Sequence, residues 1–184
     1  IHQLFSTDEA QCLLKELCSK DSYWLDGKKT AGSHAAKVKE NLQLDKDSDV
    51  AVKNSKGIAA KIKNDPLLKS FCLPKLIHGI IFSKTRKGEG YGMHVDNAFM
   101  SSGRSDLSFT LFLSSPQDYE GGHLCIQTLQ DIKKIKLSAG QLIIYPSTSL
   151  HCVDKVTQGE RVVSIGWIES YISSNEDRDI LFNI

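Results

Sequence analysis

The sequence predicts a single α+β domain in which helices pack on one outer face of an antiparallel β-sandwich or jelly roll. Three observations support this fold class. The chain has 184 residues, of which 40% are hydrophobic and 24% are charged, as in ordinary globular domains. Helical patterns fill the N-terminal part, over 1–75. From Pro74 onward, short β-rich runs follow one another between turn residues.

The helical patterns lie before the β-rich part of the chain. Ser6 or Thr7 can cap a helix whose apolar positions keep helical spacing up to Leu17. Asp49 can cap a second helix. Pro66 breaks or restarts that helix, because proline cannot continue the hydrogen-bond ladder. We expect these helices to support the sheets from outside.

Eight β-rich runs occupy the following part of the chain. Because they come within about ninety residues, they favour an antiparallel sandwich or jelly roll over alternating βαβ units. We therefore expect one domain over residues 1–184, with helical support in 1–75, a jelly-roll core in 76–170 and a C-terminal tail in 171–184. The runs are Leu76–Ser83, Tyr91–Val95, Leu107–Leu113, His123–Gln127, Ile132–Leu137, Gln141–Tyr145, His151–Val156 and Arg161–Trp167.

Net charge, apolar runs and cysteine content indicate which partners and which cell compartment to expect. The formal net charge is +1, so global electrostatics do not favour a nucleic-acid partner. The apolar runs are far shorter than the roughly 20 residues that span a bilayer, and we expect neither a signal peptide nor a membrane partner. The five cysteines are odd in number and form no CxxC pair, so we expect neither a disulfide framework nor a cysteine-type zinc site. They are typical of buried apolar positions in a reducing compartment, so we expect a cytoplasmic protein.

The charge is unevenly distributed along the chain. Residues 20–90 contain 15 Lys and Arg against 8 Asp and Glu. A solvated lysine-rich face explains this excess, and so does a docking surface for an acidic partner. The polar segment Thr30–His34, flanked by lysines, fits either an exposed loop or a mobile lid over a site. As a lid it would favour an anionic substrate or an acidic protein.

Two histidines and one carboxylate form a candidate metal site. His94 and Asp96 are two positions apart in a predicted strand, so their side chains point to the same face. His151 comes much later in the chain, after four of the predicted strands. Two histidines with one carboxylate are the ligands of non-haem Fe(II) oxygenases. The spacing alone also fits a histidine on a polar strand face or a turn carboxylate.

Arg161 is a candidate anchor for an acidic cosubstrate. It opens the last β-rich run, directly after the run that begins at His151. A turn at Gln158–Gly159 would place it one strand away from that histidine. A buried arginine is a natural bidentate partner for a carboxylate. A surface arginine that pairs with Glu160 or Asp154 fits the spacing equally well.

Longer motifs add a family resemblance. The stretch YGMHVDNA, then EGGHLCIQ, then LSAGQLIIYPSTSLHCVDKVTQGERVVSIGWIES resembles the PKHD-type hydroxylases. These are bacterial relatives of prolyl 4-hydroxylases among the Fe(II)/2-oxoglutarate dioxygenases. The resemblance covers about residues 1–183 and implies a double-stranded β-helix with flanking helices. It also implies that His94, Asp96 and His151 hold iron and that Arg161 binds the C5 carboxylate of 2-oxoglutarate.

The resemblance further implies a reaction. O₂ and 2-oxoglutarate would be consumed, succinate and CO₂ released, and an unactivated C–H group hydroxylated. It leaves two substrate types open, a peptidyl group such as a prolyl residue and a free small molecule. It also suggests L-ascorbate as a reductant for over-oxidised iron. The retained carboxylate Asp96 favours hydroxylation over the halogenation of relatives that lack it.

Individual positions qualify the resemblance. Tyr91 should flank the pocket, where it would contact cosubstrate or substrate or simply pack in the core. Relatives often carry a tyrosine where this chain has Thr85, so another group would support the cosubstrate. His123 follows two glycines and is a tempting extra ligand, but a structural or exposed role is simpler. Cys152 should point away from the metal, into the core.

Two other classes of function share part of this pattern. A non-catalytic, cupin-like binding or sensory module would keep the barrel without turnover, and loss of a ligand or of Arg161 would favour it. A zinc hydrolase could use the same three ligands. Such an enzyme would need a general base beside the metal-bound water, and it would give Arg161 no task.

Overall fold

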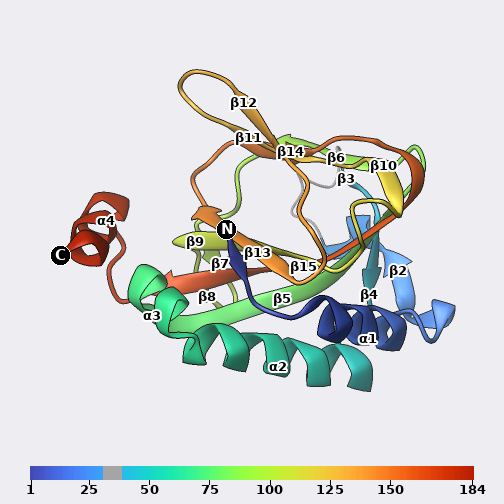
Figure 1. Ribbon diagram of the computed structural model, residues 1–184, viewed down its shortest axis with the longest axis horizontal. Coiled ribbons are helices and arrows are strands. Elements are labelled where there is room, and N and C mark those ends of the chain that lie inside the picture. The colour runs from blue at the N-terminus through green and yellow to red at the C-terminus, as the bar shows by residue number, and fades with distance from the viewer. Residues whose placement is uncertain (31–38) are drawn as a thin grey trace.

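The computed structural model describes residues 1–30 and 39–184. The polar segment predicted as a lid or loop falls largely on residues 31–38 and lies outside the described residues. Two antiparallel sheets face each other, and three helices lie along the outer face of the larger sheet (Figure 1). This is the predicted α+β arrangement.

The larger sheet has eight strands. In spatial order they are β1 (His2–Gln3), β13 (Gln141–Pro146), β9 (Leu107–Phe112), β15 (Val156–Ser170), β5 (Pro74–Arg86), β4 (Leu42–Leu44) and β2 (Trp24–Asp26), and β10 (Tyr119–Gly121) also pairs with β15.

The smaller sheet has five strands and covers the other side of the sandwich. Its order is β12 (Ile132–Ile135), β11 (Leu124–Gln127), β14 (His151–Val153), β6 (Gly90–His94) and β3 (Lys39–Glu40). A separate hairpin joins β7 (Phe99–Met100) to β8 (Gly103–Arg104). Each of the eight predicted runs became a strand. The short strands β1 to β4, β7, β8 and β10 were not predicted, because such short segments carry no detectable alternation.

The helices are α1 (Thr7–Leu17), α2 (Asp49–Asn64), α3 (Pro66–Cys72) and α4 (Asn175–Asn183). Ser6 caps α1 as predicted, and its hydroxyl accepts from the amide of Glu9 at 3.2 Å. The cap of α2 is Ser48 instead of Asp49, because the Ser48 hydroxyl is the group that accepts from the third amide of the helix. Pro66 restarts the chain as the first residue of α3, where its missing N–H is not needed.

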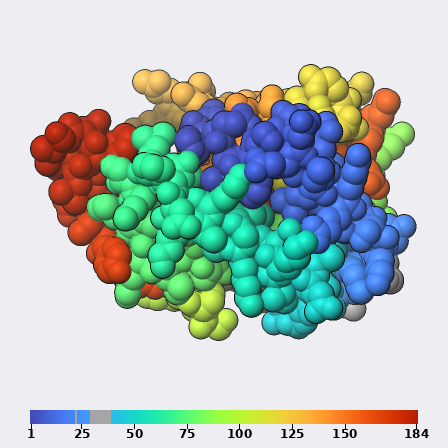
Figure 2. All heavy atoms as spheres, turned by 60° about the horizontal axis from the view of Figure 1, so that its bottom comes forward, coloured from blue at the N-terminus to red at the C-terminus, as the bar shows by residue number. Residues whose placement is uncertain are grey.

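The apolar core has two layers, one on each side of the larger sheet. The outer layer packs α1, α2 and α3 against the sheet, and these helices cover one face of the molecule (Figure 2). The inner layer lies between the two sheets. Alternate side chains of β15 point into the two layers. Val162 packs in the layer with the helices, and Val163 packs in the layer that faces the smaller sheet. Ser164 is fully buried on the same side as Val162.

One predicted turn is wrong. Gln158–Gly159 lies inside β15, where it pairs with β10, and the chain turns earlier, between Val153 and Val156. Strand β15 pairs within the larger sheet, whereas β14 belongs to the smaller one. Arg161 therefore faces His151 from the opposite sheet instead of from a neighbouring strand. The Gln158–Gly159 pattern misled because Gly159 has a positive φ of 73° while still in the ladder.

None of the helices in the described parts of the chain is long and apolar enough to cross a membrane.

The outer core layer should dominate stability. Phe82 on β5 is 1% exposed among the helices, so Phe82→Ala should lower the free energy of unfolding by about 3–5 kcal/mol. Phe99, which is 77% exposed, is the matched control, and Phe99→Ala should change it by less than about 0.5 kcal/mol. Urea unfolding followed by circular dichroism measures both. Equal losses in the two variants would contradict this core assignment.

Candidate active site

A cavity of about 820 Å³ opens between the two sheets. The smaller sheet contributes residues of β6 and β14, and the larger sheet contributes residues of β5, β9, β13 and β15. The predicted site residues that line it are His94, Asp96, His151, Arg161, Tyr91 and Thr85. The fold therefore brings all six sequence-predicted positions to one cavity.

The two histidines meet because their strands pair. In the antiparallel ladder of β14 and β6, His151 stands directly opposite His94, and the ring centroids are 4.3 Å apart. Nδ1 of His94 lies 2.8 Å from the carbonyl of Gly92, and Nδ1 of His151 lies 2.9 Å from the carbonyl of Ser149. A carbonyl only accepts, so each Nδ1 carries the proton. Each Nε2 therefore keeps a lone pair.

Both lone pairs face Asp96. Nε2 of His94 is 3.8 Å from Oδ1 of Asp96, and Nε2 of His151 is 3.9 Å from Oδ2. Burial and the neighbouring His151 lower the pKa of His94, which favours the neutral imidazole that a metal requires. Ligand atoms of the three residues lie within 4.8 Å of one another. Two free imidazole nitrogens and a carboxylate oxygen around one point fit a divalent iron ion.

Two side chains that were not predicted for this role fix the carboxylate. The Ser108 hydroxyl donates to Oδ2 of Asp96 at 2.6 Å, and the indole N–H of Trp167 donates to the same oxygen at 2.9 Å. Neither donor bonds Oδ1, which lies 3.8 Å from Nε2 of His94. Trp167 lies an even number of positions from Arg161 along the chain, but this spacing does not indicate the hydrogen bond to Asp96. No sequence pattern indicated Ser108 as a partner of Asp96, because the two residues lie on separate segments of the chain.

Arg161 is 2% exposed and points into the cavity from β15. The surface alternative is wrong, because Glu160 lies 4.0 Å from Lys84, and Asp154 pairs with Lys134. Among the described residues, no carboxylate pairs with the guanidinium, and its Nε has no hydrogen-bond partner. Burial lowers the pKa of Arg161, as expected for a buried cation without a counter-charge. An anion in the cavity would supply that charge.

Aromatic and small polar groups complete the walls. Tyr91 stacks on the His94 ring with centroids 3.7 Å apart, and burial raises its pKa to about 12. Tyr145 meets the His151 ring edge-on at 5.2 Å. Thr85 stands directly across the ladder from Arg161 and is buried. The chain therefore surrounds the metal-type ligands with rings and places a small hydroxyl group beside the arginine.

Lys39 is a cavity residue that the sequence did not single out as buried. It is 4% exposed on β3, and its Nζ lies 5.5 Å from the Tyr91 ring centroid. Burial lowers its pKa to about 8, and the nearby Asp96 charge opposes this shift. Its position in a lysine-rich stretch hid it, because the sequence alone does not distinguish a buried lysine from its exposed neighbours.

Comparison with known proteins agrees with this geometry. Residues 80–169 match the family model of the 2OG-Fe(II) oxygenase superfamily, a span that contains the His-Asp-His cluster and Arg161. A PKHD-type hydroxylase of Prochlorococcus marinus strain MIT 9211 is 58% identical over 184 residues, which is 100% of this chain and 83% of the relative. Another, from strain MIT 9303, is 61% identical with the same coverage.

Solved structures share the fold at low identity. A prolyl 4-hydroxylase of Pseudomonas putida superposes with a TM-score of 0.65 at 18% identity, covering 94% of this chain and 91% of that one. A prolyl hydroxylase of Trichoplax adhaerens, solved with a peptide fragment of hypoxia inducible factor, also gives 0.65 at 13% identity, covering 98% and 84%. The predicted jelly roll is thus confirmed.

The fold and the site define an oxidoreductase that uses Fe(II), 2-oxoglutarate and O₂. Within the 2OG-Fe(II) oxygenase superfamily, the chain belongs to the PKHD-type hydroxylases. The predicted family is confirmed.

The hydrogen bond from Ser108 should tune metal affinity. Ser108→Ala removes one of the two donors that hold Asp96, so Fe(II) should bind about 10–100-fold more weakly. Ser105→Ala is the matched control, because Ser105 is a buried serine whose hydroxyl has no partner in the described structure. Anaerobic titration calorimetry with Fe(II) measures both. Unchanged affinity in Ser108→Ala would show that Trp167 alone orients the carboxylate.

Proposed function

We propose that this enzyme hydroxylates an unactivated C–H group, with iron on His94, Asp96 and His151 and with the C5 carboxylate of 2-oxoglutarate on Arg161. The observation that carries the proposal is the pairing of two features in one cavity. Three metal-type ligand atoms converge on one wall. On the facing sheet stands a buried arginine that pairs with no carboxylate of residues 1–30 or 39–184. A dicarboxylate that chelates iron at one end needs such a cation at the other.

Fe(II), when bound, would supply O₂ activation coupled to decarboxylation of 2-oxoglutarate to succinate and CO₂. The chain's own residues position and shield this chemistry. The Gly92 and Ser149 carbonyls keep Nε2 of each histidine free for the metal. Ser108 and Trp167 hold the carboxylate of Asp96. The apolar layer around Val163 and Leu124 excludes water from the inner end.

Arg161 has suitable surroundings for a cosubstrate anchor. Its guanidinium carbon lies 5.3 Å from the Phe112 ring centroid, which fixes the plane of the fork. Thr85, directly opposite in the ladder, is the polar neighbour on β5. We place the cosubstrate carboxylate between Arg161 and the Thr85 hydroxyl, where relatives often use a tyrosine. Tyr91, stacked on His94, would flank the keto-acid end.

The substrate class follows from the size and charge of the cavity. About 820 Å³ admits 2-oxoglutarate together with a peptidyl side chain or a small molecule. Lys39 on the cavity wall favours a substrate that carries an acidic group. A peptidyl prolyl substrate agrees with the similarity in fold to the two solved prolyl hydroxylases. We further propose that ascorbate supports turnover, as the family resemblance suggests.

The five free cysteines suit a reducing cytoplasm, where we place the enzyme. We treat residues 1–184 as one catalytic domain, since the helices of the N-terminal part share a core layer with the sheet. The alternative of a non-catalytic cupin-like module is less favoured, because all three ligands and the arginine are retained. A zinc hydrolase would leave the buried cation of Arg161 without a task.

Anaerobic titration with Fe(II) and then 2-oxoglutarate tests the proposal. Wild type should show the weak visible charge-transfer band of a chelated keto acid. The 2-oxoglutarate concentration that gives half of the maximal band intensity should rise by at least about 100-fold in Arg161→Ala, because a bidentate charged contact is lost. Arg161→Lys, which keeps the charge without the fork, should fall between the two. Circular dichroism confirms that each variant is folded.

Arg86→Ala is the matched control, because Arg86 lies at the exposed end of β5 and pairs with Glu89. It should leave the titration unchanged. A folded, metal-loaded wild type without the band would overturn the enzyme assignment in favour of a non-catalytic module. An unchanged titration in Arg161→Ala would move the cosubstrate to another part of the cavity.

A further inference from the structure

The outer face of the smaller sheet carries a second cluster of metal-type ligands. Sγ of Cys125, Sγ of Cys152 and a carboxylate oxygen of Asp154 lie within 4.8 Å of one another. They come from β11, from β14 and from the residue just beyond β14. Neither the proposed hydroxylase chemistry nor the cavity between the sheets uses them.

Strand register explains why these groups meet. Cys125 stands directly opposite Cys152 in the ladder of β11 and β14. Two residues further along each strand, the Asp154 amide donates to the His123 carbonyl at 3.0 Å. His123 and Asp154 are therefore the next cross-strand pair on the same face. Because side chains two apart share a face, the four side chains form a square of two adjacent cross-strand pairs. The predicted core position of Cys152 is wrong, because this residue is only partly buried on the outer face.

His123 completes the set. Its Nδ1 lies 3.6 Å from Oδ2 of Asp154, and this buried nitrogen has no hydrogen-bond partner among the residues that the structure describes. Two thiols, one imidazole and one carboxylate are a donor set that Zn²⁺ accepts in tetrahedral sites. Ligand atoms around a tetrahedral zinc are about 3.5–3.8 Å apart. The two thiols and the Asp154 carboxylate lie within 4.8 Å of one another, and the His123 ring is 3.6 Å from that carboxylate, so rotamer changes of these side chains would bring the four groups onto one ion.

We propose that Cys125, Cys152, Asp154 and His123 bind one zinc ion that clamps β11 to β14 on the back of the sheet. This site would be distinct from the iron site, because alternation turns His151 and Cys152 to opposite faces of β14. The two sites also differ in chemistry. Thiolates select zinc, whereas the cluster facing the cavity offers only nitrogen and oxygen.

One neighbouring charge competes with the cation. Lys134 on β12 stands opposite Cys125, and its Nζ lies 3.1 Å from Oδ2 of Asp154. The lysine side chain is 61% exposed, so it can turn to solvent when a divalent ion takes its place. Lys136 does not compete, because its ammonium donates to the Tyr119 carbonyl at 2.6 Å.

Cobalt spectroscopy on the full, reduced, metal-stripped chain tests the site. Added Co²⁺ should produce a sulfur-to-cobalt charge-transfer band that saturates at one thiolate-bound ion per chain, and one equivalent of Zn²⁺ should remove it. The iron site cannot produce this band, since it contains no sulfur. In Cys152→Ser the zinc affinity should fall by more than about 100-fold, beyond the effect of losing a supporting contact.

Cys12→Ser is the matched control, because Cys12 is an exposed free cysteine on α1, and it should keep the band. Asp154→Asn retains both thiols and should also weaken zinc, which covers the case of a poorly folded cysteine variant. A wild type that gives no band, or a band that persists in Cys152→Ser, would overturn the proposal. So would a chain that forms a Cys125–Cys152 disulfide in air and binds no zinc when reduced.

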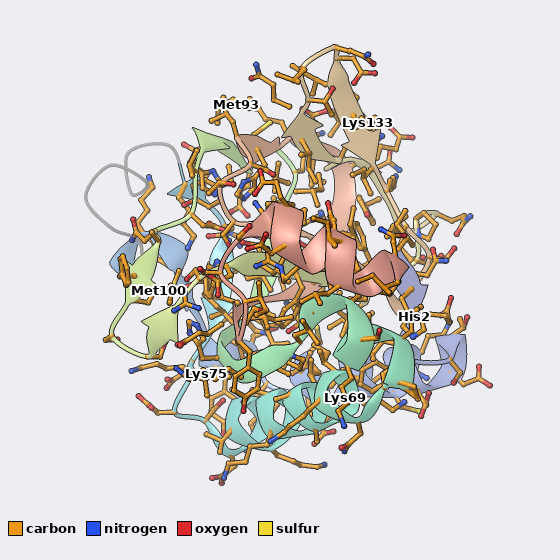
Figure 3. All side chains as sticks on the ribbon, turned by 90° about the vertical axis from the view of Figure 1, so that its left-hand side faces the viewer. His2, Lys69, Lys75, Met93, Met100 and Lys133 are labelled. Carbon is orange, nitrogen blue, oxygen red and sulfur yellow. The ribbon has the colours of Figure 1, made fainter. Side chains whose placement is uncertain are left out.

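Lys134 provides a test in the opposite direction. Lys134→Ala frees the carboxylate of Asp154 and should tighten zinc binding by about two- to fivefold. Lys133→Ala is the control, because Lys133 pairs with Ile126 and so faces the other side of β12, at the end of the molecule where Figure 3 labels it. Competition titration against a chromophoric chelator measures both. Weaker binding in Lys134→Ala would mean that the cluster is held by the lysine and is no zinc site.

Discussion

The register between β14 and β6 is the constraint on which the site depends. It sets His151 opposite His94 and turns both Nε2 atoms toward Asp96. A slip of one residue would move His151 to the outer face and bring Cys152 into the cavity. The ladder with β11 on the other side of β14 secures this register, because Ile126 stands opposite His151. The metal ligands therefore meet only when these strands pair in this register.

The larger sheet supplies the positive charge of the site through Arg161. Arg161 is buried with no carboxylate partner in the described parts of the chain, and this burial costs stability, because a desolvated cation is expensive unless it is paired. The two apolar layers on either side of β15 offset this cost through Val162 on one face and Val163 on the other. The protein therefore keeps a buried cation where a dicarboxylate can meet it, and the rigid sheet holds that cation in position before the dicarboxylate binds.

The sequence predicted the ligands better than it predicted their geometry. His94 and Asp96 could be paired by alternation, and all eight β-rich runs became strands, because their apolar periodicity reflects the two-sided core. The place of Arg161 could not be predicted, since Gln158–Gly159 has the composition of a turn yet lies within a long strand. The partners of Asp96 and the burial of Lys39 depend on contacts between distant segments, which local patterns do not encode.

The alternation of β14 also explains how one short strand can serve two kinds of chemistry. Its inner side chain, His151, belongs to a nitrogen and oxygen cluster in the cavity between the sheets. Its outer side chain, Cys152, belongs to a sulfur-containing cluster on the other face of the same sheet, where Cys125 is buried and Cys152 is partly exposed. The backbone between them is fixed by ladders on both edges, so a cation on the outer face would stiffen the strand that holds the inner ligand. Sulfur ligands are softer than imidazole nitrogen and carboxylate oxygen ligands, so the two faces would prefer different metal ions. Only the sheet would separate the two sites.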